Sequence, residues 1–253
     1  YRVIVPDLLG FGRSDKPDAP ELYRIERHAR RLEALLESLD PRDVTLVPQD
    51  WGGPIGLWWA TRHPERVRSL AILNTFAHRP AAKVSLPLPI HLFRTRGVGE
   101  LMVKGLHAFV RMFVFKAGVV RHDRLTPAVR EAYLAPHRSW SSRTPVLVFP
   151  REIPAGPGGR VADFLGEVHR GLAAFASRPV FIAWAMKDVA FTPEMLEQLW
   201  LRDFPRAEVL RLADDLGVET PVMAVTGDVL AVARRLLDPE ADYLETIKVI
   251  EAQ

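Results

Sequence analysis

The order of apolar and amphipathic segments is the feature that most constrains how this chain can fold. Short, apolar, β-branched runs at residues 1–6, 44–48 and 67–73 alternate with helix-forming segments at residues 24–39 and 54–63. Parallel strands need a long crossover between them, and a helix usually supplies it. The alternation therefore predicts an α/β protein whose mostly parallel sheet is covered by helices.

The alternation stops after residue 78 and returns near residue 178. The intervening residues are richer in Pro, Arg and aromatic side chains and include helix-forming patches at 99–115 and 162–175, which indicates an inserted helical lid. A strand, a helix and a strand follow, at residues 180–185, 193–200 and 208–212. We expect four parts: a first core part at 1–78, the lid (cap) at 79–177, a second core part at 178–212 and a C-terminal segment at 213–253. Because the chain begins inside a strand and without Met, we also expect the fold to be incomplete at the N-terminus.

The composition narrows the classes of function. The chain has 253 residues, 48% of them hydrophobic, which suits one sizeable core. The 34 Lys and Arg nearly balance the 31 Asp and Glu, so we expect no nucleic-acid partner. The chain has no cysteine, which excludes disulfides, thiolate metal sites and cysteine nucleophiles. No group of His, Asp and Glu shows ligand spacing along the sequence, so we expect no metal and no cofactor.

Membrane contact is not favoured either. No stretch reaches the roughly 18–20 apolar residues that cross a bilayer. The nearest, residues 109–120, is short and contains Arg111 and Lys116. This favours a helix packed on its own domain over contact with a membrane surface. We expect a cytoplasmic protein.

The stretch 46–56, LVPQDWGGPIG, places an acid between a predicted strand and a predicted helix. A strand, a sharp turn and a helix form the nucleophile elbow of the α/β-hydrolase fold, in which the turn raises one side chain clear of the sheet. Here the raised residue is Asp50, with Gly52 and Gly53 giving room behind it, and Pro48 stands where the elbow usually has Gly.

The chemistry of this position follows from its surroundings. The helix N-terminus supplies backbone N–H groups and positive dipole, which would keep Asp50 ionised and let the Trp51 N–H stabilise an oxyanion. An ionised carboxylate can displace a leaving group from carbon and form an ester that water must then hydrolyse. The alternative is that Asp50 merely caps the helix. Its position four residues before Pro54 fits a simple cap poorly.

Several longer motifs carry a resemblance to a known family. The segments VIVPDLLGFGRSDKP, DVTLVPQDWGGPIGL, PERVRSLAILNT, VLVFPREIP and PVFIAWAMKD resemble the haloalkane dehalogenase branch of the α/β-hydrolases, from residue 1 to about residue 212. The resemblance implies that Asp50 is the nucleophile and that the indole N–H of Trp51 holds the departing halide. It also implies that Asp188, after the strand that follows the lid, orients a catalytic histidine. The alternatives are a buried aromatic under the lid for Trp51 and a helix cap for Asp188.

The resemblance fails where the catalytic histidine should stand. That residue should follow Leu212 by a few positions, but the segment reads ADDLGVETPVMAVTGD, and no histidine follows His169. His78, just past the end of the third predicted strand, is the only substitute near the edge where α/β sites form. Residues 213–253 diverge from the family.

Three functions remain open. The first is hydrolysis of carbon–halogen bonds. The second is suggested by FPREIPAGPGG and WAMKD, which look at least as much like the β-lactone decarboxylases of long-chain olefin biosynthesis. The third is a catalytically silent fragment that lacks the base. The first two imply a small apolar substrate, a halocarbon or a long-chain β-lactone, and the second implies partner enzymes if the chain works in an olefin-biosynthesis complex. Epoxide hydrolysis needs two lid tyrosines, whereas only Tyr133 falls in the lid.

Overall fold

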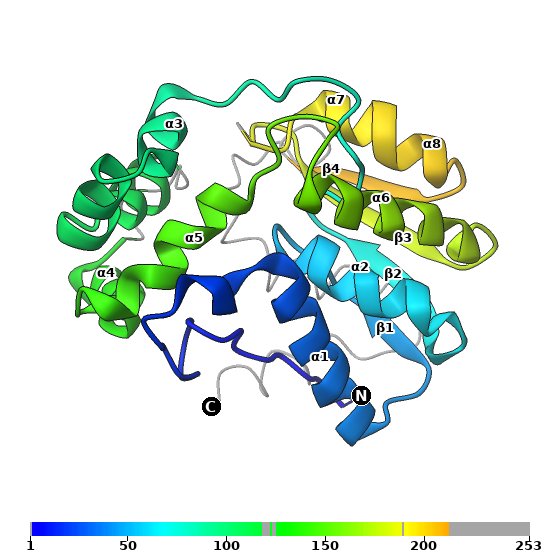
Figure 1. The fold of residues 1–253 in the computed structure, drawn as a ribbon. Helices are drawn as coiled ribbons and strands as arrows, with labels where there is room; N and C mark the ends of the chain where they lie inside the picture. The colour runs from blue at the N-terminus through cyan, green and yellow to red at the C-terminus, as the bar shows by residue number, and fades with distance from the viewer. Residues whose placement is uncertain (1, 118–121, 123–124, 189, 213–253) are drawn as a thin grey trace.

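Within the described residues, the computed structural model has a four-stranded parallel sheet at its centre (Figure 1). The description covers residues 2–117, 122, 125–188 and 190–212, so the predicted C-terminal segment at 213–253 lies outside it. The strands lie in the order in which they occur along the chain: β1 (Val44–Leu46), β2 (Val67–Ile72), β3 (Val180–Ala185) and β4 (Glu208–Leu212). The predicted α/β class and these four strands are confirmed.

The middle of the sheet is buried on both faces, which explains why β3 is continuously apolar instead of alternating. All six residues of β3 are buried. Ile182 and Trp184 belong to the large cluster beneath the helices, whereas Phe181 and Ala183 belong to a separate cluster. Successive strand residues point to opposite faces, so one strand contributes to two cores.

The predicted strand at residues 1–6 is not formed in its described part. Residues 2–6 have no strand assignment and pair with none of the described strands. The side chains of Val3 and Val5 are 73% and 84% exposed. The run has the composition of a strand, but a strand also needs a neighbour to share its ladder of hydrogen bonds. The prediction was therefore wrong for these residues.

Three helices pack on one face of the sheet. α1 (Ile25–Leu39) and α2 (Gly52–Arg62) confirm the two predicted helices and pack against each other, and α6 (Arg160–Gly171) packs against α2. Figure 1 shows α2 and α6 side by side in front of the strands. α2 is apolar around most of its circumference because it lies between the sheet and its neighbours. Complete burial of a side chain such as Leu57 contributes about 1.5–3 kcal/mol.

A second apolar cluster lies apart from the sheet, at the left of Figure 1. It is built from α3 (Leu88–Arg94), α4 (Pro127–Leu134), α5 (Thr144–Glu152) and two π-helical segments at Glu100–Gly105 and Val110–Ala117. The predicted helical patch at 99–115 thus occurs as two segments, interrupted at His107, whose φ is 54°. The lid boundaries at 79 and 177 stay predictions. α6, which lies within them, contributes Phe164 and Leu165 to the large central cluster.

The predicted helix at 193–200 runs further than expected. α7 (Pro193–Met195), a π-helical turn at Leu196–Trp200 and α8 (Leu201–Asp203) follow one another without a break. Single turns of 3-10 helix connect the other elements, at Pro20–Tyr23, Pro64–Arg66, Ala135–His137, Ser141–Arg143 and Leu172–Phe175. Among the described helices, none combines the length and apolar character that a membrane span requires.

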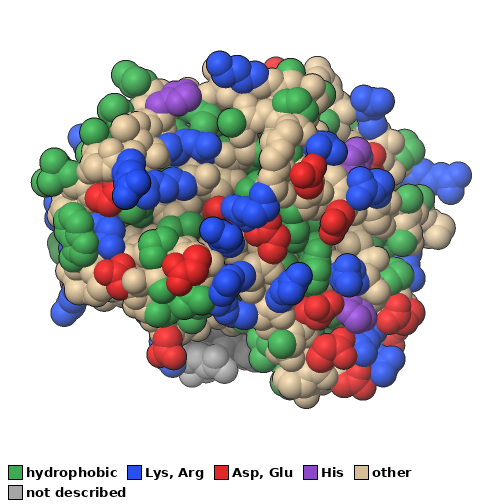
Figure 2. All heavy atoms as spheres, in the orientation of Figure 1, with side chains coloured by type: hydrophobic (Ala, Val, Ile, Leu, Met, Phe, Trp, Pro, Cys, Tyr) green, Lys and Arg blue, Asp and Glu red, His purple; other side chains and the backbone are tan. Residues whose placement is uncertain are grey.

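The surface reflects the nearly balanced composition. Figure 2 shows Lys and Arg side chains interspersed with Asp and Glu side chains over the face seen in Figure 1. Among the described ion pairs, Arg79 with Asp163 and Arg138 with Glu131 have both side chains well exposed. Such exposed pairs typically contribute less than about 1 kcal/mol each, so they shape the surface more than they stabilise the fold.

Candidate active site

Asp50 lies in the sharp turn between β1 and α2. Its φ is 45°, in the left-handed region that side chains other than Gly rarely occupy. Three backbone hydrogen bonds hold the turn: Asp50 N–H to the Asn74 carbonyl (2.9 Å), Gly52 N–H to the Gln49 carbonyl (2.7 Å) and Gly53 N–H to the Asp50 carbonyl (3.0 Å). The predicted strand, turn and helix thus form, and the strained residue is the one predicted to react.

The two glycines after Asp50 have different surroundings. A Cβ on Gly53 would lie 1.8 Å from Thr75 Oγ1, whereas a Cβ on Gly52 would meet nothing within 4 Å. Thr75 Oγ1 also donates to the Asp50 carbonyl at 2.5 Å. The start of α2 therefore lies directly against the end of β2, and only the second glycine is required by that contact.

The Asp50 carboxyl group has a pKa raised from its usual range to about 6. Desolvation is the main cause and the negative charge of Asp188 adds to it, while a hydrogen bond from the Trp51 backbone N–H opposes both. Asp50 nevertheless has solvent-exposed surface. The two observations are compatible, because water reaches the surface of the carboxylate while protein atoms slightly farther away replace most of the surrounding water. The sequence predicts that the helix N-terminus keeps Asp50 ionised. The Trp51 N–H acts in that direction, but desolvation and Asp188 outweigh it, so the pKa lies above the usual range for Asp while the group stays mostly ionised at neutral pH.

Trp51 lies between the sheet and the lid. Its half-buried ring makes edge-to-face contacts with Phe76, beyond β2, and with Phe149 of α5, at centroid distances of 5.0 and 5.3 Å. Its backbone N–H already donates a hydrogen bond to the Asp50 carboxylate. The predicted role of the indole as a halide donor stays a prediction, and the ring contacts fit the alternative of a packed aromatic under the lid equally well.

Asp188 follows β3 at the same edge of the sheet. Its Oδ1 accepts hydrogen bonds from the backbone N–H groups of Ala190 (2.8 Å) and Phe191 (3.2 Å). Burial raises the pKa of Asp188, against the lowering effect of these donors and of Asn74. The carboxylate therefore orders the turn that leads to α7. The N-cap residue of α7 is Thr192, so Asp188 does not cap that helix as the alternative supposed. It also lies close enough to Asp50 for its charge to act there.

Asn74 joins the two acidic residues, and the sequence analysis missed it. Its Oδ1 accepts from the Ala185 N–H at 2.7 Å, and its Nδ2 donates to the Ala185 carbonyl (3.2 Å) and to Asp188 Oδ2 (3.1 Å). Its backbone carbonyl accepts from Asp50 N–H. The available signal was a polar residue directly after an apolar strand, at the edge where α/β sites form.

No imidazole lies between the two carboxylates in the described part of the chain. Among the described histidines, none hydrogen-bonds to Asp50 or Asp188. His78, the predicted substitute, instead places Nε2 at 2.8 Å from Asp203 Oδ2. Burial lowers the pKa of His78, while Asp203 acts in the opposite direction. His78 therefore does not link the candidate nucleophile to the candidate acid.

Comparisons with known proteins extend over most of the chain. The family described as alpha/beta hydrolase fold matches residues 1–215. A cis-3-alkyl-4-alkyloxetan-2-one decarboxylase of Shewanella oneidensis is 38% identical over 217 residues, which are 85% of this chain and 67% of that protein. A haloalkane dehalogenase of Mesorhizobium japonicum is 39% identical over 181 residues, 68% of this chain and 56% of that protein.

Solved structures of haloalkane dehalogenases are also similar to this chain. The crystal structure of the haloalkane dehalogenase DbeA from Bradyrhizobium elkani has a TM-score of 0.72 and 29% identity, covering 90% of this chain and 80% of its own. These similarities confirm the resemblance drawn from the sequence motifs. The family match includes the elbow, Asn74 and Asp188.

Proposed function

The chain belongs to the α/β-hydrolase fold family, and from this premise we propose that Asp50 is a nucleophile that attacks a carbon atom bearing a displaceable group. The observation that carries the proposal is the elbow itself. A carboxylate with φ 45° stands between β1 and α2 and accepts a hydrogen bond from the following backbone N–H. A raised pKa also makes the ionised form more nucleophilic, provided that the pH lies above about 6.

We propose a dialkyl oxetan-2-one, a four-membered cyclic ester, as the substrate class. Two relatives named cis-3-alkyl-4-alkyloxetan-2-one decarboxylase, at 38% and 36% identity, each match 85% of this chain. The Mesorhizobium dehalogenase has a similar identity but matches only 68%. A haloalkane dehalogenase of Bradyrhizobium diazoefficiens also matches 84% of this chain, at 34% identity. The higher identity of the two decarboxylases at nearly equal coverage, and not the length of the match, supports the lactone over the halocarbon.

The reaction can be written with this chain's own residues. Asp50 attacks the ring carbon C4, and the C4–O bond of the lactone breaks, which leaves a carboxylate on C3 and an ester on Asp50. The bond from C3 to that carboxylate then breaks. Its electron pair forms the C3–C4 double bond as the C4–O bond to Asp50 breaks. The products are CO₂ and an alkene, and Asp50 returns as a free carboxylate.

This route consumes no water and needs no base. A dehalogenase route begins with the same attack but leaves an alkyl ester that water must hydrolyse, and water requires a positioned base. None of the described imidazoles contacts either carboxylate. The described site thus contains what the lactone route needs and no histidine that would serve hydrolysis.

Haloalkane dehalogenation is the second candidate. The similarity to solved haloalkane dehalogenases, at TM-scores of 0.70 to 0.72, supports it. In that reaction the Trp51 indole would hold the halide, because an indole N–H is a donor without a competing acceptor. The base would then have to come from outside the described residues.

The test is product analysis with a cis-3,4-dialkyl oxetan-2-one. We expect alkene and CO₂ in amounts that exceed the protein many times over, and loss of both in Asp50→Asn. The matched control is Asp43→Asn, an exposed aspartate that also has a positive φ, of 52°, and lies outside the site. Alkene formation that persists in Asp50→Asn would show that Asp50 is not the nucleophile. Loss in Asp43→Asn as well would indicate a general effect on the fold.

A further inference from the structure

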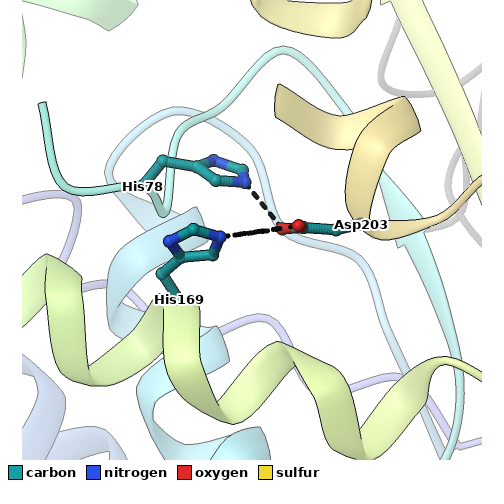
Figure 3. A group of neighbouring side chains, drawn as sticks. All are labelled: His78, His169 and Asp203. Carbon is teal, nitrogen blue, oxygen red and sulfur yellow. Dashed lines mark hydrogen bonds and ion pairs between the residues drawn. The ribbon is translucent and has the colours of Figure 1, made fainter. Parts of the chain in front are cut away.

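A second group of polar side chains lies away from the Asp50 site. His78, His169 and Asp203 converge from three separate segments (Figure 3): the loop after β2, helix α6 and the end of α8. The sequence does not reveal this group, because its members are far apart along the chain. Folding alone brings them together, so their spacing is set by the packing of the core.

The distances are close to those of a metal site. His78 Nε2 and His169 Nε2 lie 2.8 and 3.3 Å from Asp203 Oδ2, and the three candidate ligand atoms all lie within 4.8 Å of one another. Ligand atoms bound tetrahedrally at about 2.0–2.2 Å from Zn²⁺ are roughly 3.4 Å apart. Small rotations of the two imidazoles would therefore place an ion among the three atoms.

Without an ion, this group is poorly satisfied. Both imidazoles direct Nε2 at the same carboxylate oxygen, and their ring centroids are only 4.5 Å apart. Two imidazolium ions at this distance would repel each other, while two neutral rings can each offer Asp203 only one N–H. A divalent cation would instead accept the lone pairs of both Nε2 atoms and balance the carboxylate charge.

The surroundings hold the ligands and leave one side open. The ring of His78 packs edge-on against Trp200 at 4.9 Å, and Trp200 Nε1 donates to the Thr75 carbonyl, so His78 has a fixed support. Its side chain is 5% exposed, whereas those of Asp203 and His169 are 25% and 42% exposed. An ion could enter from the His169 side, and water could complete its coordination there.

We propose that His78, His169 and Asp203 bind a divalent transition-metal ion of the zinc class through two imidazole nitrogens and one carboxylate oxygen. Imidazole nitrogen suits Zn²⁺, Co²⁺ and Ni²⁺ better than the hard ions Mg²⁺ and Ca²⁺. The ion would connect the exit of β2 to α6 and α8. It would thus stabilise the core beside the Asp50 site without touching the reacting carboxylate.

The test uses the whole chain, freed of metal by chelation. Calorimetry with Zn²⁺ and visible absorption with Co²⁺ should each report one ion per chain, and Zn²⁺ should raise the melting temperature. His169→Gln and Asp203→Asn should each weaken Zn²⁺ binding at least about tenfold, because even outer-shell partners of a ligand typically contribute about 10–100-fold. Glutamine keeps a hydrogen-bond donor for Asp203 but removes the imidazole. The His169 side chain is 42% exposed and does not belong to the apolar clusters, so its replacement should leave the core intact.

The matched control is His63→Gln. His63 also lies beside carboxylates, with Nε2 at 3.3 Å from Glu33 and 3.7 Å from Glu37, but on a different part of the surface. Its replacement should leave Zn²⁺ affinity and stoichiometry unchanged. The proposal is overturned if the wild-type chain shows no saturable binding. It is equally overturned if His63→Gln removes the binding, or if His169→Gln and Asp203→Asn bind Zn²⁺ as tightly as wild type. In those cases the group is an ion-pair network alone.

Discussion

Asp50 is subject to opposing influences that set the pH at which it can react. Desolvation and the charge of Asp188 disfavour its ionised form, and the Trp51 backbone N–H favours it. The position of Asp50 in the turn between β1 and α2 was predictable, because a strand, an acid and a Gly-Gly pair followed by a helix are typical of this turn. Its pKa was not predictable, because the desolvation that mainly raises it, and the charge of Asp188 that adds to it, come from segments that only folding brings together.

The first prediction concerns pH. Because the pKa of Asp50 is about 6, the carboxyl group is protonated below that value and cannot attack. The rate of alkene formation should rise with pH and level off above about pH 7, and at pH 5 it should be about tenfold below the plateau. Asp188→Asn removes a like charge, so the midpoint should move to lower pH. Rate profiles of both proteins between pH 4.5 and 8 test this. A midpoint that moves upward would contradict the assigned cause.

The second prediction concerns Asn74, whose side chain connects β2 to β3 and Asp188. Asn74→Leu leaves the buried Ala185 N–H and one Asp188 oxygen without their partner. We expect the free energy of unfolding to fall by about 2–3 kcal/mol, since each unsatisfied buried group costs about 1–3 kcal/mol. The alkene rate should also fall, because the Asn74 backbone carbonyl, which accepts from the Asp50 N–H, loses the side-chain anchor that fixes it to β3. Urea unfolding and the rate assay measure the two effects.

The control for Asn74 is Ser69→Ala, in β2, the strand that precedes Asn74. Ser69 is buried and makes one side-chain hydrogen bond, to Thr45 Oγ1. Its loss should cost only about 1 kcal/mol and leave the rate unchanged. Equal losses of stability in the two variants would mean that the Asn74 side chain contributes no more than a single buried hydrogen bond.

At the scale of elements, prediction succeeded where a segment's own pattern determines its structure. The apolar runs that alternate with helix-forming segments correctly predicted β1 to β4, and amphipathic spacing correctly predicted α1. It failed at residues 1–6, because an apolar run becomes a strand only beside another strand. It missed Asn74 and the group of His78, His169 and Asp203 for a related reason. These residues make their contacts only when elements that are distant in sequence pack together.

The third prediction tests the contact between α2 and β2. Gly53→Ala forces a Cβ into Thr75 Oγ1, Thr75 Cβ and the Phe76 carbonyl, at 1.8, 2.9 and 3.1 Å. Such overpacking should lower the free energy of unfolding by about 1–3 kcal/mol. Gly52→Ala places a methyl group in open space at the start of a helix, so its effect should lie between zero and about 1 kcal/mol of stabilisation. Urea unfolding of the two variants compares them directly.

A double-mutant cycle locates the cause. Adding Thr75→Ala to Gly53→Ala removes the nearest clashing atom, so the two changes together should cost less than the sum of their separate costs. If the costs simply add, the elbow does not depend on the approach of Gly53 to Thr75.

At the scale of the whole molecule, the parallel sheet brings Asp50, Asn74 and Asp188 from three strand ends to one edge. The lid helix α5 reaches this edge through Phe149, which contacts Trp51. The contact between the Trp51 and Phe149 rings thus brings α5 next to the candidate nucleophile. Among the described residues, no imidazole hydrogen-bonds to Asp50 or Asp188, and the presence or absence of such a base separates two reactions that start with the same attack.

The fourth prediction uses that difference. A bromoalkane should alkylate Asp50 once, because attack needs only an ionised carboxylate and a leaving group. The resulting ester should persist, since a positioned base typically contributes about 10²–10⁴ to the rate at which water is activated. Intact-mass analysis should therefore find one alkyl group per chain, absent in Asp50→Asn and present in Asp43→Asn. The same preparation should turn over the oxetan-2-one repeatedly, because expulsion of CO₂ frees Asp50 without water. Halide release that continues well beyond one equivalent would contradict this scheme and would require a base from outside the described residues.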